Sequence, residues 1–396
     1  MKKVLIAIAL MLGIINVNAQ VLKQCEPSEV GLDASRLAYA DSAINKAITE
    51  KATPGAVLCV VRHGKIAYLK AFGNKRVYPK VEKMTTETVF DMASCSKSMS
   101  TAICAWILIE QGKLRLLDRV DKYIPGFENW KDTAGNTTSI RVIDLMTHIS
   151  GLPAYADVNK VKEKYGAPNR DGLIDYISHC KRDFEPTTDF QYSCLNYITL
   201  QRIIETISGE SLNVFAKKHI FDVLGMSHTD YTPSSALAKL CAPTEKQAGG
   251  KCLQGVVHDP LARIINGGIS GNAGVFSTAE DIATLCAALQ NGGSWNGHRI
   301  LSPSAVKAMR TVPRRAAKFG RTPGWDCYSD YASNSGDMLS AETYGHSGFT
   351  GTSIVIDPVN DISVILLCNS VHPDGEGNVI GLRSYVANAV ASSILK

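Results

Sequence analysis

The chain has 396 residues, of which 45% are hydrophobic and 20% charged, a composition typical of a globular protein with two or three domains or one composite domain. The formal net charge is +5, and Lys2 and Lys3 supply two of these charges, which leaves +3 for the rest of the chain. This small excess, without a basic stripe of interleaved aromatic residues, gives no support for a nucleic-acid partner.

The N-terminal residues 1–19 have the pattern of a secretory signal peptide. Two lysines precede an apolar run over 4–15, and small residues stand at −3 and −1 of a cleavage site after Ala19. The apolar run is too short to span a bilayer, and no other stretch is long enough. We therefore expect export to the periplasm or the exterior of a bacterium, with no stable membrane anchor after cleavage.

The eleven cysteines and nine histidines do not form a metal-binding pattern. No Cys-x-x-Cys pair and no zinc-type histidine spacing occurs, and the glycine-rich segment 267–274 fits no nucleotide-binding motif. We therefore predict no metal and no cofactor. The odd number of cysteines leaves at least one free if all disulfides are internal, and their pairing stays open.

Strand patterns lie at both ends of the chain and helix patterns between them. Periodicity, caps and turn residues predict, in chain order, a helix over 33–51, a hairpin of strands over 55–61 and 66–72, a helix from Ser94 to about Gly112, helices over 140–148, 171–180, 196–208, 212–224 and 277–289, a hairpin of strands over 352–357 and 362–369, and a closing helix over 379–395. Residues 227–260 show little periodicity, which predicts an extended excursion of the chain over the surface, without regular secondary structure.

This order predicts an α+β fold, in which an antiparallel sheet built from both termini is flanked by helices and carries a mostly helical lobe. We expect residues 20–396 to form one domain with a sheet lobe, 20–95 and 265–396, and a helical lobe, 96–264. A cleft between the lobes is the expected place for a ligand.

The stretch from Phe90 to Lys97 places a serine hydroxyl three residues before a lysine, where an apolar helical run begins. Residues three apart share a helix face, so Ser94 and Lys97 are expected to be neighbours. A lysine left neutral by burial can take the proton of a serine, and a helix N-terminus offers unpaired N–H groups to an oxyanion. An isolated Ser-x-x-Lys is weak evidence, because a helix cap followed by a solvated lysine gives the same pattern.

Two later stretches complete a candidate site. Tyr192 precedes the helix over 196–208, and beside a lysine its phenol would have a lowered pKa and could shuttle protons, although such tyrosines more often pack or cap. His346 lies in the glycine-rich stretch 344–352, where small residues let a backbone N–H approach a substrate oxygen. A lone histidine in such a turn is also compatible with a structural role.

Taken together, the motifs at 94–97, 192–194 and 346–348 resemble, in this order, those of the serine β-lactamase and penicillin-binding protein superfamily. The resemblance covers nearly all of the mature chain and is greatest to the class C-type branch, which includes class C β-lactamases, D-alanyl-D-alanine carboxypeptidases, D-aminopeptidases, esterases and acyltransferases. It implies the β-lactamase/transpeptidase-like fold. His148 belongs to a matching stretch but to no catalytic motif, so we expect a structural residue near the lobe junction.

The resemblance also implies roles for individual residues. Ser94 attacks an acyl carbon and forms an acyl-enzyme, while Lys97 and Tyr192 share the proton transfer. The backbone N–H groups of Ser94 and Phe349 form the oxyanion hole. The residues expected to bind substrate are His346, Ser347, Gly348, Phe349 and Cys194.

Two of these positions depart from many relatives. His346 stands where many carry lysine, and an unperturbed imidazole, with a pKa of about 6.5, would give the pH–rate profile a limb near neutrality. Cys194 stands where relatives usually have an asparagine that binds the lysine and a substrate amide, whereas a thiol is a weak hydrogen-bonding group. Both departures argue against tight recognition of penicillins and cephalosporins.

We therefore expect an exported serine hydrolase that forms an acyl-enzyme through Ser94 and cleaves a small ester or amide. Three alternatives stay open: acyl transfer to an alcohol or amine, β-lactamase or D-alanyl-D-alanine carboxypeptidase activity on cell-wall peptides, and a non-catalytic penicillin-binding sensor. An α/β-hydrolase is disfavoured because the sequence has no Gly-x-Ser-x-Gly elbow.

Overall fold

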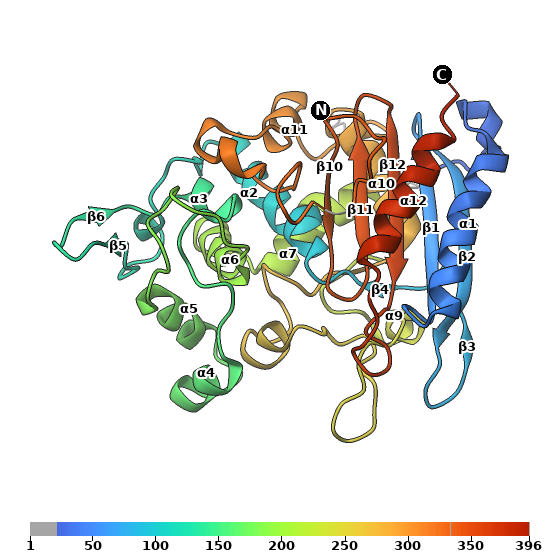
Figure 1. Cartoon of the computed structure of the whole chain (residues 1–396). Coiled ribbons are helices and arrows are strands. Elements are labelled where there is room, and N and C mark those ends of the chain that lie inside the picture. The colour runs from blue at the N-terminus through green and yellow to red at the C-terminus, as the bar shows by residue number, and fades with distance from the viewer. Residues whose placement is uncertain (1–21, 333, 396) are drawn as a thin grey trace, which may run out of the picture.

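The computed structural model describes residues 22–332 and 334–395 (Figure 1). The predicted signal peptide, residues 1–19, lies outside the described residues. All eleven cysteines lie inside them, and each is a free thiol. Across the described ranges, every helix is too short or too polar to cross a membrane.

The centre of the fold is a six-stranded antiparallel sheet with the order β10-β11-β12-β1-β2-β3. β1 pairs with β12, with Val57 opposite Leu367 and Val60 opposite Val364, so the two ends of the chain meet in the middle of the sheet. This confirms the predicted sheet built from both termini. The strands are β1 (Gly55–Arg62), β2 (Lys65–Arg76), β3 (Glu82–Lys83), β10 (Tyr344–Ser347), β11 (Ser353–Asp357) and β12 (Ile362–Cys368).

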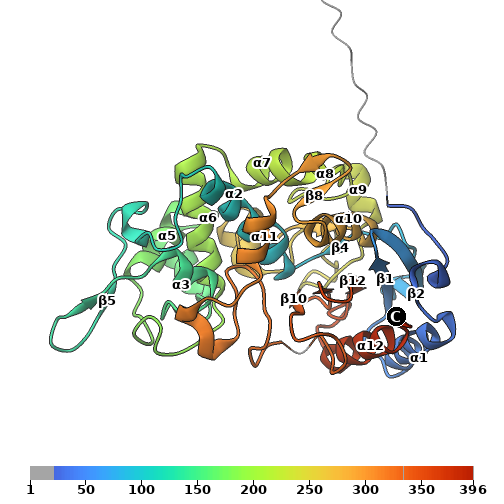
Figure 2. The ribbon, with the colours of Figure 1, turned by 90° about the horizontal axis from the view of Figure 1, so that it is seen from above.

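Helices cover both faces of this sheet. Successive side chains of a strand point to opposite faces, and all eight residues of β1 are buried, so both faces need a cover. Leu58 and Val60 belong to the core shared with α1 and α12, whereas Val57 and Cys59 belong to the core that includes α10. Figure 2 shows α1 and α12 on one side of the sheet and α10 on the other. These helices are α1 (Ala34–Thr49), α10 (Ala279–Gln290) and α12 (Ile380–Ser392).

The remaining elements lie mostly beside the sheet, where β5 and β6 lie farthest from α1 and α12 and α3 to α6 lie on the same side (Figure 1). The other helices are α2 (Ile103–Glu110), α3 (Val142–Met146), α4 (Val158–Tyr165), α5 (Arg170–His179), α6 (Cys194–Ser208), α7 (Leu212–Ala216), α8 (Asp222–Leu224), α9 (Ser235–Leu240) and α11 (Pro303–Met309). Short strands pair as β4 (Phe90–Asp91) with β7 (Phe276–Ser277), β5 (Trp130–Lys131) with β6 (Thr137–Thr138), and β8 (Ser294–Trp295) with β9 (His298–Arg299). The 3₁₀ and π segments are η1 (Pro27–Val30), η2 (Lys97–Ala102), η3 (Val120–Lys122), η4 (Lys217–Phe221), η5 (Leu261–Ile265) and η6 (Arg314–Phe319).

The structure differs from the sequence prediction between the hairpins. The segment 227–260 contains α9 and buries Cys241 and Val257 in a small core of its own, so the prediction of a surface excursion is wrong there. The helix predicted over 140–148 is shorter, because His148 has a φ of +60°, which no helix accommodates. The periodicity did not predict α4, whose only buried residue is Val161. The division into a sheet lobe and a helical lobe stays a prediction.

Candidate active site

Ser94 lies at the start of the helix that continues into η2 and α2. The turn before it puts Ala93 at a φ of +45°, a region that residues other than glycine rarely adopt. The buried carboxylate of Asp91 holds this turn, because it accepts hydrogen bonds from the Ala93 N–H at 2.9 Å and the His258 N–H at 2.7 Å. The Lys97 N–H donates to the Ser94 carbonyl at 3.0 Å and begins the helix.

Lys97 reaches back to the serine from a fully buried position. Its Nζ donates to Ser94 Oγ at 3.0 Å and to the Asn272 carbonyl at 2.9 Å, and lies 3.6 Å from Cys194 Sγ. Lys97 opens η2, a six-residue π-helical stretch, and such wider turns occur frequently at functional sites. Lys97 thus contacts both Ser94 and Cys194 through its Nζ atom.

The charge of Lys97 depends on its two ionisable neighbours. Burial works against the charge, whereas the Cys194 thiol and the Tyr192 phenol raise the pKa of Lys97 when they are ionised. Burial raises the pKa of both neighbours. The three groups therefore titrate as one cluster, and the neutral form of Lys97 as the base stays a prediction.

Tyr192 lies against the lysine and lines the cleft. Lys97 Nζ is 4.9 Å from the Tyr192 ring centroid, and the ring stacks on Tyr331 at 5.1 Å and on His148 at 4.5 Å. The hydroxyl is buried and has no hydrogen-bond partner among the described residues. Burial raises the pKa of the phenol more than Lys97 lowers it, so the expected lowered pKa is wrong. Tyr192 is a neutral proton donor in the free enzyme.

His346 lies on β10, the edge strand beside the cleft. Its Nδ1 is 2.9 Å from the Ser347 carbonyl, which only accepts, so Nδ1 carries the proton and Nε2 is the acceptor. Nε2 is buried without a partner among the described residues. Burial, followed by the charges of Arg321 and Lys97, lowers the pKa of His346 well below its usual value. The prediction that His346 gives the pH–rate profile a limb near pH 6.5 is therefore wrong, because His346 is neutral at that pH.

The turn after β10 is fastened to the segment that carries the nucleophile. Thr350 Oγ1 donates to the Asp91 carbonyl at 2.7 Å, and Thr352 Oγ1 donates to the Met92 carbonyl at 3.1 Å. A Cβ on Gly348 would lie 2.7 Å from the Met92 carbonyl, so only glycine fits this approach. The turn is thereby fixed beside Ser94.

The substrate-binding segment ends at Phe349, whose ring is 74% exposed and stacks on His258 at a centroid distance of 5.7 Å. Ser347 and Gly348 precede it and line the same cleft. The roles of the Ser94 and Phe349 N–H groups as an oxyanion hole stay a prediction.

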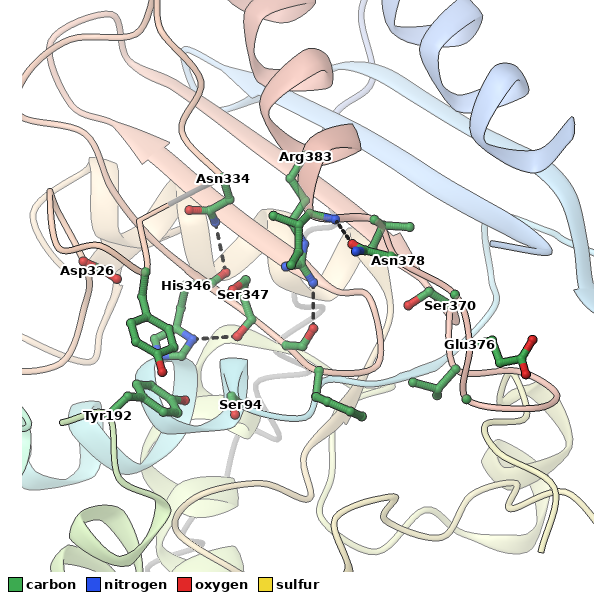
Figure 3. Close-up of a pocket in the computed structure, with 18 of the residues that line it drawn as sticks. Ser94, Tyr192, Asp326, Asn334, His346, Ser347, Ser370, Glu376, Asn378 and Arg383 are labelled. Atoms are coloured by element: carbon green, nitrogen blue, oxygen red, sulfur yellow. Dashed lines mark hydrogen bonds between the residues drawn. The ribbon is translucent and has the colours of Figure 1, made fainter. Parts of the chain in front are cut away.

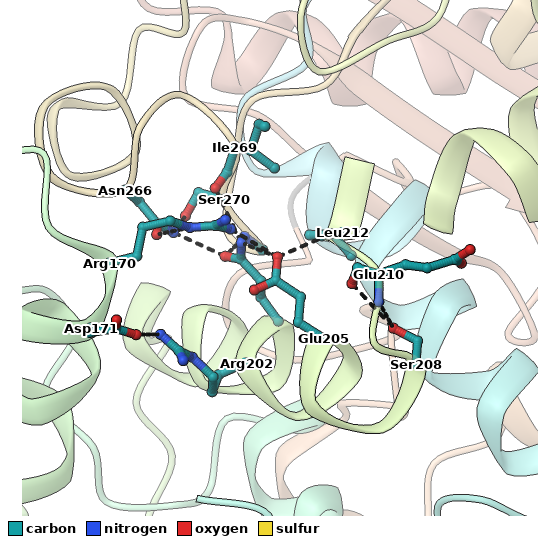
Figure 4. A network of polar contacts seen from close by, with 12 residues as sticks. Arg170, Asp171, Arg202, Glu205, Ser208, Glu210, Leu212, Asn266, Ile269 and Ser270 are labelled. Atoms are coloured by element: carbon teal, nitrogen blue, oxygen red, sulfur yellow. Dashed lines mark hydrogen bonds and ion pairs between the residues drawn. The ribbon is translucent and has the colours of Figure 1, made fainter. Parts of the chain in front are cut away.

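A polar network holds the segment that precedes Asn272, and Figure 4 shows the part of it around Arg170, Glu205 and Asn266. Gln201 on α6 accepts at Oε1 from the Gly271 N–H at 2.9 Å and donates to Glu205 at 3.1 Å, and Arg170 donates to the same carboxylate at 2.8 Å. The sequence showed only that the segment 267–274 has no nucleotide-binding motif. In the structure, this segment supplies the Asn272 carbonyl that accepts a hydrogen bond from Lys97. No sequence motif pointed to Asn272.

The site opens into a cleft of about 510 Å³. Figure 3 shows Tyr192 and His346 on one side of Ser94, and Ser370 and Glu376 on the other. Cys194 is partly exposed and lies 3.6 Å from Lys97 Nζ, and its contact with substrate stays a prediction. Sequence reasoning also missed Arg321, a buried cleft residue whose guanidinium donates to Asp326 at 2.7 Å.

Comparison with known proteins agrees with this arrangement. The Beta-lactamase family matches residues 40–386. A putative D-alanyl-D-alanine carboxypeptidase of Escherichia coli K12 is 30% identical, covering 94% of this chain and 92% of that protein, and an N-acetylmuramyl-L-alanine amidase of Bacillus subtilis 168 is 32% identical, covering 81% and 78%. The solved structure of EstCE1, a hydrolase with promiscuous acyltransferase activity, has a TM-score of 0.71 and 23% identity, covering 90% of this chain and 99% of that one. The chain belongs to the Beta-lactamase family and has the β-lactamase/transpeptidase-like fold.

Proposed function

We propose that this protein is an exported serine hydrolase that forms an acyl-enzyme through Ser94 and cleaves a small ester or amide. The observation that carries the proposal is the 3.0 Å contact between Lys97 Nζ and Ser94 Oγ, with the lysine fixed from behind by the Asn272 carbonyl. A serine needs an adjacent base to become a nucleophile, and this geometry supplies one once the cluster has lost a proton.

The chemistry follows in two steps. Ser94 Oγ attacks the acyl carbon while its proton passes to the Lys97/Tyr192 pair, and the pair returns a proton to the leaving alcohol or amine. Water then attacks the acyl-enzyme, gives a proton to the same pair and releases the acid, with the proton returned to Ser94. Each group ends as it began, so no cofactor is consumed.

The test is labelling with a fluorescent fluorophosphonate, combined with hydrolysis of p-nitrophenyl acetate and butyrate. Wild type should be labelled once and should turn over both esters, whereas Ser94→Ala should do neither while keeping the wild-type unfolding temperature. Retention of most activity in Ser94→Ala would falsify the acyl-enzyme mechanism.

Cell-wall peptides are a second candidate substrate class, supported by the E. coli relative at 30% identity. Release of D-alanine from a peptide ending in D-alanyl-D-alanine, at a kcat/KM above that for p-nitrophenyl butyrate, would favour it. Acyl transfer is supported by the fold shared with EstCE1. It predicts a new ester when an alcohol is added to the p-nitrophenyl butyrate reaction.

A further inference from the structure

A second hollow lies on the outer face of the sheet layer, between α1 and α12. It is a groove of about 1010 Å³, twice the volume of the catalytic cleft. Tyr39 and Tyr385 stand in its lining with 59% and 67% of their surfaces exposed. Small residues facing each other across the two helices leave the space between these rings open: Ala43, Ala47, Gly381 and Ala389.

The groove adjoins the catalytic cleft, because Asn378 and Ile380 line both. The two helices run antiparallel, since the Leu395 N–H, just past α12, donates to the Gly31 carbonyl, just before α1. The first turn of α12 is therefore the end of the groove that meets the cleft. From there the 13 residues of α12 extend about 20 Å.

The direction of the substrate follows from the proton donor. Tyr192 protonates the leaving group, so the leaving group lies on the Tyr192 side of Ser94. The acyl group then points to the other side, where Asn378 lies in Figure 3. On that side the lining combines the apolar Val371, Val379 and Ile380 with the polar Ser370, Glu376 and Asn378.

The two basic side chains in the lining of the groove, Arg36 and Lys46, each lie near a carboxylate, so they do not indicate an anionic ligand. Arg36 lies 3.7 Å from the carboxylate of Asp33, and Lys46 lies 3.8 Å from that of Glu50. The basic side chains of the lining thus have acidic neighbours on their own helix. The apolar part of the lining, which includes Ala43, Ala47, Ile380 and Leu382, suits a neutral alkyl chain, whose burial is favourable in proportion to the area removed from water.

We propose that the groove between α1 and α12 binds the distal part of a long acyl chain whose carbonyl carbon is attacked by Ser94. This inference rests on the proposed function and names its substrate class, an ester of a medium- or long-chain acid.

The test blocks the mouth of the groove with Gly381→Phe. A Cβ at Gly381 meets only the edge of the Tyr385 ring, at 3.8 Å, so the position accepts a side chain. The measurement is the ratio of kcat/KM for p-nitrophenyl dodecanoate to that for p-nitrophenyl acetate. In wild type the ratio should exceed one, and Gly381→Phe should lower it by about tenfold or more, since loss of roughly two buried methylene groups has that effect.

Three variants serve as comparisons. Tyr385→Asp, on the exposed wall, should lower the same ratio. Gly381→Ala adds no ring, so the dodecanoate-to-acetate ratio should stay close to that of wild type. Val359→Phe places a ring on a turn residue that is 61% exposed and lies outside the groove, so this ratio should not change. Equal ratios in wild type and Gly381→Phe, or a wild-type ratio below one, would overturn the proposal.

A binding measurement separates this inference from the proposed function. Dodecanoate should bind to Ser94→Ala in calorimetry, and adding Gly381→Phe should weaken that binding by about tenfold. If no ester is hydrolysed but this binding pattern holds, the proposed function fails and the groove assignment stands. Absence of dodecanoate binding would contradict an acyl-chain site. The same holds if Gly381→Phe changes only the sedimentation of the protein with phosphatidylcholine vesicles, or only its self-association.

Discussion

The thiol of Cys194 lies 3.6 Å from Lys97 Nζ. The side chain of Asn272 adjoins this thiol and lowers its pKa, although burial raises the pKa by more. Asn272 Nδ2 is buried and has no strong partner among the described residues. An ionised Cys194 raises the pKa of Lys97, so the residue at position 194 affects the proton transfer at Ser94.

Cys194→Asn should shift the pH–rate profile. Because the cluster must lose a proton to act as base, kcat/KM for p-nitrophenyl butyrate should rise with pH in wild type. The asparagine removes one ionisable member of the cluster, so the pH at which the rise occurs should change. Cys194→Ala should move it in the same direction. Superimposable profiles for the three proteins would show that the thiol does not influence the base.

Cys194→Asn should also improve lactam turnover relative to esters. An asparagine restores one neutral hydrogen bond, which contributes about 0.5–1.5 kcal/mol, or roughly a two- to tenfold gain in kcat/KM. The measurement compares a chromogenic cephalosporin with p-nitrophenyl butyrate, and Cys194→Ala, which lacks the amide, is the control. A wild-type cephalosporin value near the diffusion limit would instead make the protein an efficient β-lactamase.

Lys97→Ala and Tyr192→Phe should each lower turnover by roughly two to four orders of magnitude, the usual scale for loss of general acid–base catalysis. Tyr192→Phe keeps the ring that packs between His148 and Tyr331, so it removes the proton donor alone. The check is steady-state hydrolysis of p-nitrophenyl butyrate at matched unfolding temperature. A loss of less than tenfold for Tyr192→Phe would assign proton transfer to Lys97 and water.

His346→Lys should improve substrates that bear a carboxylate. Wild-type His346 is neutral above pH 6.5, because burial and the charges of Arg321 and Lys97 lower its pKa. A lysine that keeps its proton would bring a cation to the cleft edge. The measurement is kcat/KM for p-nitrophenyl esters of succinate against butyrate between pH 6 and 9. An unchanged succinate-to-butyrate ratio at every pH would show that position 346 does not face the acyl group.

Local patterns were sufficient for the four strands of the two predicted hairpins and for the place of Ser94, whereas the two-residue strand β3 was not predicted. The apolar runs over 55–61 and 362–369 each predict a strand, and the Ser94 helix begins where the apolar run begins, because these signals lie within a few residues. The surroundings of Lys97 could not be predicted in this way. Asn272 approaches from 175 positions away, and the pKa of the lysine depends on which ionisable groups fold against it.

The histidines of the site should make the protein less stable in acid. His148 is fully buried, and its Nδ1 accepts from the Ser193 N–H at 3.1 Å and contacts Asn196 Nδ2 at 3.2 Å, so the fold requires the neutral ring. Burial, then Arg321 and Lys97, lower the pKa of His148 well below its value of about 6.5 in the unfolded chain.

Below pH 6.5, His148 therefore binds a proton in the unfolded state but stays neutral in the folded state. The free energy of unfolding should fall as the pH drops below 6.5, by up to about 1.4 kcal/mol per pH unit for each such histidine, until the folded-state pKa is reached. Urea unfolding at pH 7.5, 6.5 and 5.5 checks this in wild type and His148→Gln, whose amide oxygen can still accept from Ser193. The glutamine variant should lose less stability between pH 6.5 and 5.5 than wild type, and an equal loss would mean that His148 titrates normally in the folded protein.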